Sequence, residues 1–138
     1  MAQVLYNGDG VAELLVGRRI VSVEHGEFEY THPGYGSGYR DKATGRLTLD
    51  DGTEILVTPN QGGCSCSAGD YYLTSLAACD NVITSVRTEI EDGKWDAKTY
   101  RIYVLADNVE INAVQIDGDD GNGYYGTGYE LIVTLPGE

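Results

Sequence analysis

Residues 46–59 have the sequence RLTLDDGTEILVTP, and this stretch predicts a β-hairpin. Leu47 and Leu49 alternate with polar residues, which is the pattern of a strand with one buried face. The Asp51-Gly52 pair tolerates the positive φ angles of a two-residue primed turn, and a second β-rich run then continues to Pro59. We therefore expect two adjacent antiparallel strands joined at Asp51-Gly52.

Runs rich in β-branched and aromatic residues recur on both sides of this hairpin. Such runs are typical of strands, whereas no segment keeps a helical period over the length of a helix. A single helical turn is expected at Val11 to Val16, with Gly17 as its C-cap. The chain of 138 residues therefore predicts one mainly β domain (1–138), a compact antiparallel sheet curled into a small barrel or sandwich with at most one or two short helical turns. The expected strands are residues 19–24, 28–30, 46–50, 53–58, 81–90, 99–106, 109–116 and 129–135, and residues 72–76 fit either a short strand or a helical turn.

Two glycine-rich segments interrupt this pattern. Residues 33–45, PGYGSGYRDKATG, have no apolar period and predict a mobile loop. Tyr35 and Tyr39 in this loop either contact a partner or belong to a hairpin tip. Residues 117–128, DGDDGNGYYGTG, predict a second loop, in which two kinds of ligand site compete with a plain solvated turn.

The first candidate in this second loop is a calcium site on Asp117, Asp119 and Asp120, because Ca²⁺ prefers oxygen ligands. The spacing departs from an EF-hand, since Gly128 stands where that loop has Glu. The second candidate is a nest of glycine amides that holds an anion, beside tyrosine rings that stack on a base. The positive charge for such a site has to come from Arg87 or Arg101 on neighbouring strands, from Arg40 or Arg46, or from a second subunit.

The three cysteines are Cys64, Cys66 and Cys79. An odd count without a leader sequence argues against a disulfide framework. The three thiols could hold a zinc ion together with His25 or His32, although their spacing is not that of the common structural zinc sites. The alternative is that the thiols are small buried groups, and we expect no metal and no cofactor.

The net charge of −13 narrows the choice of partner. Sequence-independent binding to DNA or RNA needs an excess of Lys and Arg, and so does docking on an anionic membrane. The negative net charge therefore argues against both kinds of partner.

No apolar run is long enough to span a bilayer, and the start MAQVLYNGDG lacks the regions of a signal peptide. No Ser/His/Asp elbow, Walker loop, HExxH or dinucleotide motif is present. We therefore expect a cytoplasmic protein that is not an enzyme.

Five segments, in order, resemble a family of small phage and bacterial proteins. They are LLVGRRIVSVE (14–24), LTLDDGTEILV (47–57), GGCSCSAGDYYLTSLAACDNVIT (62–84), RIYVLADNVEIN (101–112) and GDDGNGYYGTGY (118–129). This family, with many members in phages of actinobacteria, is similar to the first-described Thoeris anti-defence proteins. The resemblance implies a non-enzymatic homo-oligomer, from dimer to hexamer, that sequesters a cyclic nucleotide signal of the cyclic ADP-ribose type in the host cell cytoplasm.

Sequestration needs an aromatic ring to stack on the adenine, and amides and arginines to hold the pyrophosphate. The expected ligand-binding residues are Asn122, Gly123, Tyr124, Tyr125, Arg101 and Arg87. Two alternatives fit the same sequence. An acidic, glycine-rich, all-β domain suits a small virion or structural protein of a phage without a ligand, and the acidic loop suits a Ca²⁺-stabilised binding module.

Overall fold

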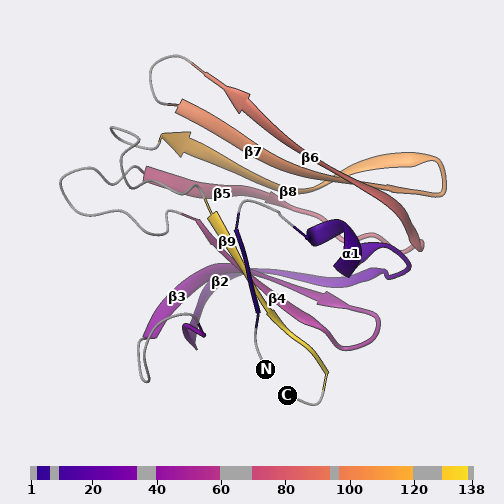
Figure 1. The fold of residues 1–138 in the computed structure, drawn as a ribbon, viewed down its shortest axis with the longest axis horizontal. Helices are drawn as coiled ribbons and strands as arrows, with labels where there is room; N and C mark the ends of the chain where they lie inside the picture. The colour runs from indigo at the N-terminus through magenta and orange to yellow at the C-terminus, as the bar shows by residue number, and fades with distance from the viewer. Residues whose placement is uncertain are drawn as a thin grey trace.

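The computed structural model describes residues 3–6, 10–33, 40–59, 70–93, 97–119 and 129–136. Within these residues nine strands form two antiparallel sheets (Figure 1), ordered β1-β9-β4-β3-β2 and β5-β8-β7-β6. The two sheets form an open sandwich and do not close into a barrel, which confirms the predicted mainly β fold. The elements are β1 Gln3–Tyr6, α1 Val11–Leu15, β2 Ile20–Thr31, β3 Arg40–Leu49, β4 Glu54–Pro59, β5 Asp70–Leu76, β6 Ile83–Asp92, β7 Ala97–Ala106, β8 Val109–Asp119 and β9 Tyr129–Thr134.

The hairpin predicted at residues 46–59 is present as β3 and β4, but its loop has three residues. The Leu49 N–H donates to the Thr53 carbonyl (2.9 Å), and the Gly52 N–H donates to the Leu49 carbonyl (3.0 Å). Gly52 has a φ of 93°. The loop is therefore a type I turn closed by a left-handed glycine, and the predicted two-residue turn is wrong.

The first half of β3 shortens the loop that was expected at residues 33–45. Residues 40–45 pair with β2 as a strand, and the strands expected at 19–24 and 28–30 are both parts of β2. The polar composition of residues 40–45 conceals this strand, because its buried residues are the small Ala43 and Gly45. Residues 34–39, with their two tyrosines, lie outside the described residues.

Helix α1 confirms the helical turn expected before Gly17. Its buried residues, Val11 and Leu15, are each 2 % exposed. Gly17 follows the helix with a φ of 85°, and its N–H donates to the carbonyl of Ile83 at the start of β6 (2.8 Å). The helix and the residues after it therefore cover the beginning of β6.

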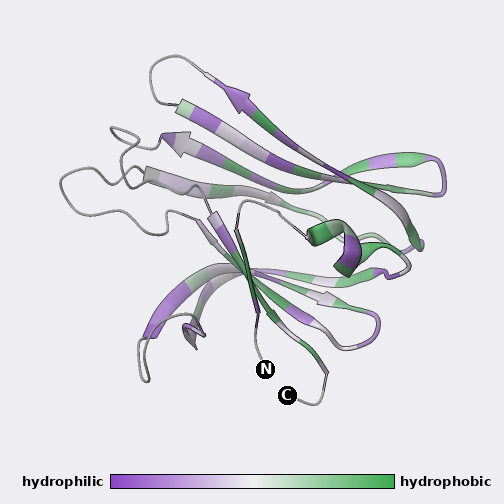
Figure 2. Cartoon of the chain, viewed as in Figure 1, coloured by the Kyte–Doolittle hydropathy of each residue, from purple (hydrophilic) through white to green (hydrophobic). Residues whose placement is uncertain are grey.

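The main core lies between the two sheets. Tyr71, Tyr100 and Tyr129, from β5, β7 and β9, pack edge to face with ring centroids 5.6 and 5.4 Å apart. Such aromatic pairs add roughly 0.5–1.5 kcal/mol each beyond the burial of their surface. Along the strands, hydrophobic and hydrophilic residues alternate (Figure 2), which places one face of each sheet in this core.

The five-stranded sheet curls, and β2 and β3 bend together (Figure 1). His32, directly after β2, binds Glu130 of β9 with 2.7 Å between Nε2 and Oε2, although β3 and β4 lie between β2 and β9 in the sheet. The end of β2 therefore folds over the outer face of the sheet. This fold encloses a second, smaller core that consists of buried Ala43, Leu56 and Ile132 with Val4, Phe28 and Tyr30 packed against them.

Candidate functional site

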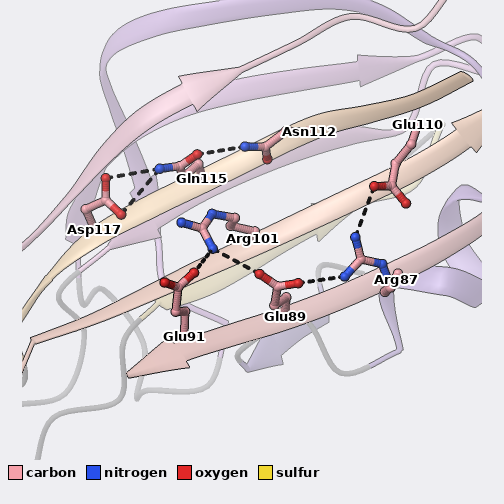
Figure 3. Close-up of polar contacts among 8 residues, drawn as sticks. All are labelled: Arg87, Glu89, Glu91, Arg101, Glu110, Asn112, Gln115 and Asp117. Atoms are coloured by element: carbon pink, nitrogen blue, oxygen red, sulfur yellow. Dashed lines mark hydrogen bonds and ion pairs between the residues drawn. The ribbon is translucent and has the colours of Figure 1, made fainter. Parts of the chain in front are cut away.

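Two of the predicted site residues lie together on the outer face of the four-stranded sheet (Figure 3). Arg87 of β6 and Arg101 of β7 share the carboxylate of Glu89, at 2.6 and 3.0 Å respectively. Arg87 also binds Glu110 (3.0 Å), and Arg101 also binds Glu91 (2.6 Å). These five side chains form one row of alternating charge, which we call the charge ladder. The two arginines lie on strands that pair with each other, and of these two strands only β7 pairs with β8.

The carboxylates of the ladder shift the proton affinities of their partners. Hydrogen bonds to Glu89 and Glu110 raise the pKa of Arg87, and hydrogen bonds to Glu91 and Glu89 raise the pKa of Arg101. The hydrogen bond from Arg87 lowers the pKa of Glu89. Three carboxylates thus face two guanidinium groups, and the ladder keeps a net negative charge.

The ladder changes the role expected of the two arginines. A phosphate group that approached Arg87 or Arg101 would meet carboxylates, because each guanidinium already contacts two of them. Arg87 also lies over the ring of Tyr103, 4.4 Å from its centroid, in a cation–π contact. These contacts favour a structural role for both arginines. The other predicted ligand-binding residues lie outside the described residues: Asn122, Gly123, Tyr124 and Tyr125.

A second polar row on β8 runs beside the ladder (Figure 3). The Asn112 side-chain amide donates to Gln115 Oε1 (2.7 Å), and Gln115 Nε2 donates to Asp117 Oδ2 (3.2 Å). β8 continues to Asp119, so residues 117–119 are part of a strand and not of the expected loop. Asp117 is therefore held on the sheet in a defined orientation.

This polar row leads to a hollow of about 400 Å³ at the end of the four-stranded sheet, which we call the β7–β8 hollow. Its walls include Tyr72, Lys98, Thr99, Asp117 and Asp119. Tyr72 of β5 and Thr99 of β7 lie on either side of Asp117 in the strand register. The volume falls within the range of roughly 300–1,000 Å³ that is typical of small-ligand sites.

A second hollow of about 470 Å³, the β3–β5 hollow, lies between β5 and the β2–β3 hairpin. Its walls include His25, Asp41, Lys42 and Tyr72. Tyr72 thus contributes to both hollows, and it is 56 % exposed while its neighbour Tyr71 is buried. Tyr72 is not among the site residues predicted from the sequence, because residues 72–76 fit either a strand or a helical turn. In a strand, the adjacent Tyr71 and Tyr72 point to opposite faces of the sheet. A strand prediction for these residues would therefore have indicated that one of the two tyrosines is exposed.

The candidate metal ligands do not gather in the described part of the chain, where no group of three or more His, Cys, Asp or Glu side chains could hold a metal ion. Cys79 is buried and pairs with Ile20 at the start of β2, whereas His32 follows the end of β2. The remaining candidates lie outside the described residues: Cys64, Cys66 and Asp120.

These features define a small mainly β protein of two open sheets, with a polar outer face that leads to a hollow at the sheet end. Residues 13–131 match a family model described as a domain of unknown function (DUF7448), and the chain belongs to that family. The comparisons with curated proteins and with solved structures gave no match. No helix in the described ranges is long and apolar enough to cross a membrane.

Proposed function

We propose that this protein is a non-enzymatic binding protein that sequesters a small cyclic nucleotide of the cyclic ADP-ribose type. As the resemblance noted above implies, it would act for a phage against a host defence signal in the host cytoplasm. The observation that carries the proposal is the exposed ring of Tyr72, which lies between the β7–β8 and β3–β5 hollows. An exposed aromatic wall between two hollows suits a ligand with one flat base and one polar part.

The side chains around Tyr72 supply the chemistry that such a ligand needs. The phenol ring offers a face for an adenine, and Asp117 offers carboxylate oxygens to ribose hydroxyls. Positive charge for a pyrophosphate comes from Lys98 in one hollow and from Lys42 in the other, where the His25 ring adds a polar group. These cations are not the predicted Arg87 and Arg101, because the guanidinium groups of those two residues bind carboxylates in the charge ladder.

The predicted residues Asn122, Gly123, Tyr124 and Tyr125 follow Asp119 closely in the sequence, and Asp119 lines the β7–β8 hollow. The proposal keeps them as ligand-binding residues. Sequestration requires no general base, nucleophile or metal, because the protein only keeps the signal away from its receptor and does not react with it. The bound ligand should therefore be recovered unchanged.

Isothermal titration calorimetry with the isomers of cyclic ADP-ribose tests this proposal. We expect one isomer to bind, Tyr72→Ala to weaken binding at least about tenfold, and Tyr72→Phe to retain it, since stacking on one base contributes roughly 1–3 kcal/mol. Val109→Ala is the matched control, because Val109 is 57 % exposed at the other end of the same sheet. Absence of heat with every isomer for folded protein at about 50 µM would refute nucleotide binding. Conversion of the ligand during the titration would refute the non-enzymatic part.

A further inference from the structure

Strand β6 ends the four-stranded sheet, and within the described residues no strand pairs with its outer edge (Figure 1). Its first residue, Ile83, donates its N–H to the Arg18 carbonyl (2.9 Å) and accepts from the Gly17 N–H (2.8 Å). The backbone groups of Ile83 therefore point away from β7, toward the outer edge. In the strand register Ile83 lies opposite Ala106.

Along a strand, the backbone N–H and C=O groups of successive residues point alternately to one side and to the other. Every second residue of β6 therefore points these groups to the outer edge. In the register, these residues of β6 lie opposite every second residue of β7. Starting from Ala106, the partners on β6 that follow Ile83 are Val86, Thr88, Ile90 and Asp92. The register shift in this pairing falls between Ile83 and Ser85, and the ladder is regular from Ser85 onward. Four residues of β6 therefore present a regular row of backbone donors and acceptors.

The outer edge of β6 has few of the features that prevent pairing with another strand. Natural edges are blunted by shortness, proline, charged side chains or a bulge. β6 has ten residues and no proline, and its irregularity lies at the end that Gly17 already covers. It does carry charged side chains, so a strand that pairs with it has to match them: Arg87, Glu89, Glu91 and Asp92. Such pairing would also cover Ile90, which is 57 % exposed.

The charges on β6 select one register for pairing with a second copy. An antiparallel two-fold pairing centred on Thr88 places Arg87 opposite Glu89 of the partner subunit, twice, and Val86 opposite Ile90 of the partner subunit. Centring on Arg87 or on Glu89 would place that charge opposite itself. Centring on Ile90 would place Glu89 opposite Glu91 of the partner subunit. Of these four registers, only the Thr88 register is free of like-charge pairs. A register centred on Val86 has none either, but it would use Ile83, whose backbone groups already bind Arg18 and Gly17. The charges and the covered Ile83 together therefore select the Thr88 register.

We infer that the protein forms a two-fold symmetric dimer in which β6 pairs with β6 of a second copy around Thr88. Thr88 points its backbone groups to the edge, so the two central residues exchange both hydrogen bonds. The Arg87–Glu89 rows then fall at non-hydrogen-bonded positions, where Cα atoms are about 4.5 Å apart and side chains come closest. Because Arg87 also contacts its own Glu89 (2.6 Å), four charges of alternating sign surround the axis. The two charge ladders join into one. This inference rests on the edge of β6 and does not depend on ligand binding.

Sedimentation equilibrium of the full chain tests the dimer. We expect a dimer for the wild type and for Thr88→Val, and a monomer for Thr88→Pro. Proline at position 88 removes an N–H that points to the outer edge, so it removes no hydrogen bond to β7. Circular dichroism checks that each variant is folded. A wild-type monomer at about 100 µM, or association unchanged by Thr88→Pro in a folded protein, would overturn the inference.

Charge reversal gives a sharper test because the pairing is reciprocal. Arg87→Glu and Glu89→Arg should each raise the dissociation constant of the homodimer at least about tenfold, since each places two like charges opposite each other. An equimolar mixture of the two single variants should associate again, because each introduced side chain then faces a side chain of opposite charge across the axis. The double variant R87E/E89R should form a dimer alone. If Arg87 and Glu89 stabilised only their own subunit, mixing the two variants would not restore association. Failure of the mixture to associate would therefore contradict the Thr88 register.

Discussion

The buried contact between His32 and Glu130 fixes the curled end of β2, and its removal should be costly. We expect Glu130→Ala to lower the free energy of unfolding by about 3–5 kcal/mol, because His32 stays buried after its carboxylate partner is removed. The two side chains are 0 % and 2 % exposed and 2.7 Å apart, so the contact is shielded from bulk solvent. Domains of this size have a total stability of about 5–15 kcal/mol, so the substitution would remove a large share of it.

Urea unfolding followed by circular dichroism measures this effect as a lower midpoint with an unchanged m-value. Glu130→Gln keeps an oxygen that accepts a hydrogen bond, so its cost should be smaller, about 1–2 kcal/mol. The double variant His32→Ala/Glu130→Ala should cost less than the sum of the two single variants, because it leaves neither partner behind. A cost below about 1 kcal/mol for Glu130→Ala would refute the argument that the end of β2 is held over β9 by a buried pair.

Two further predictions concern β3 and its turn. Gly45→Ala should destabilise the protein by about 1–2 kcal/mol through overpacking, since a Cβ there would lie 2.6 Å from Leu73 Cδ2 and 2.7 Å from Leu76 Cδ1; an unchanged melting temperature would contradict the close approach of the sheets. Hydrogen bonds from the Thr53 N–H (2.9 Å) and hydroxyl lower the pKa of Asp51 below its ordinary value of 3.8. The stability that Asp51 contributes is therefore present above pH 3.8 and lost as the pH falls through the lower folded-state pKa. As the pH falls from 3.8 through the folded-state pKa of Asp51, the free energy of unfolding should decline less in Asp51→Ala than in the wild type. An identical decline in both proteins would show that Asp51 does not contribute stability in this way.

The sequence predicts much of the four-stranded sheet because local chemistry decides it. Residues 99–106 and 109–116 alternate along two strands, and Asp107-Asn108 between them tolerates left-handed backbone. The structure places these two residues at φ 52° and 61° between β7 and β8. Nothing beyond neighbouring residues is needed for this hairpin.

Other elements depend on partners that are distant in the sequence. β1 has four residues and exists as a strand through its pairing with β9. Residues 40–45 look like a loop until the second core, which buries Ala43, is known. The same holds for the site. Arg87 and Arg101 are each placed correctly in a strand, but only the register of β6, β7 and β8 places Glu89 between them.

The way in which the protein uses its cations limits the ligand that it can hold. Nine Lys and Arg stand against 22 Asp and Glu. Besides the two arginines of the ladder, three cations of the β2–β3 hairpin contact carboxylates: Arg46 with Glu24, Lys42 with Glu27, and Arg40 with Glu29. The Lys42 pair is long and exposed (3.4 Å), so a phosphate can replace Glu27 there at little cost.

Lys42 and Lys98 each line one of the two hollows beside Tyr72, so they are the lysines that an anionic group near this ring would meet. Further phosphates would meet carboxylates. We accordingly expect a shallow salt dependence, with a slope of log K on log salt of about −2 or smaller in magnitude, and no gain in affinity from a cyclic nucleotide to a linear oligonucleotide. Titrations at several salt concentrations measure this slope. A steep slope, or tighter binding of the longer ligand, would contradict a site that draws on these two lysines.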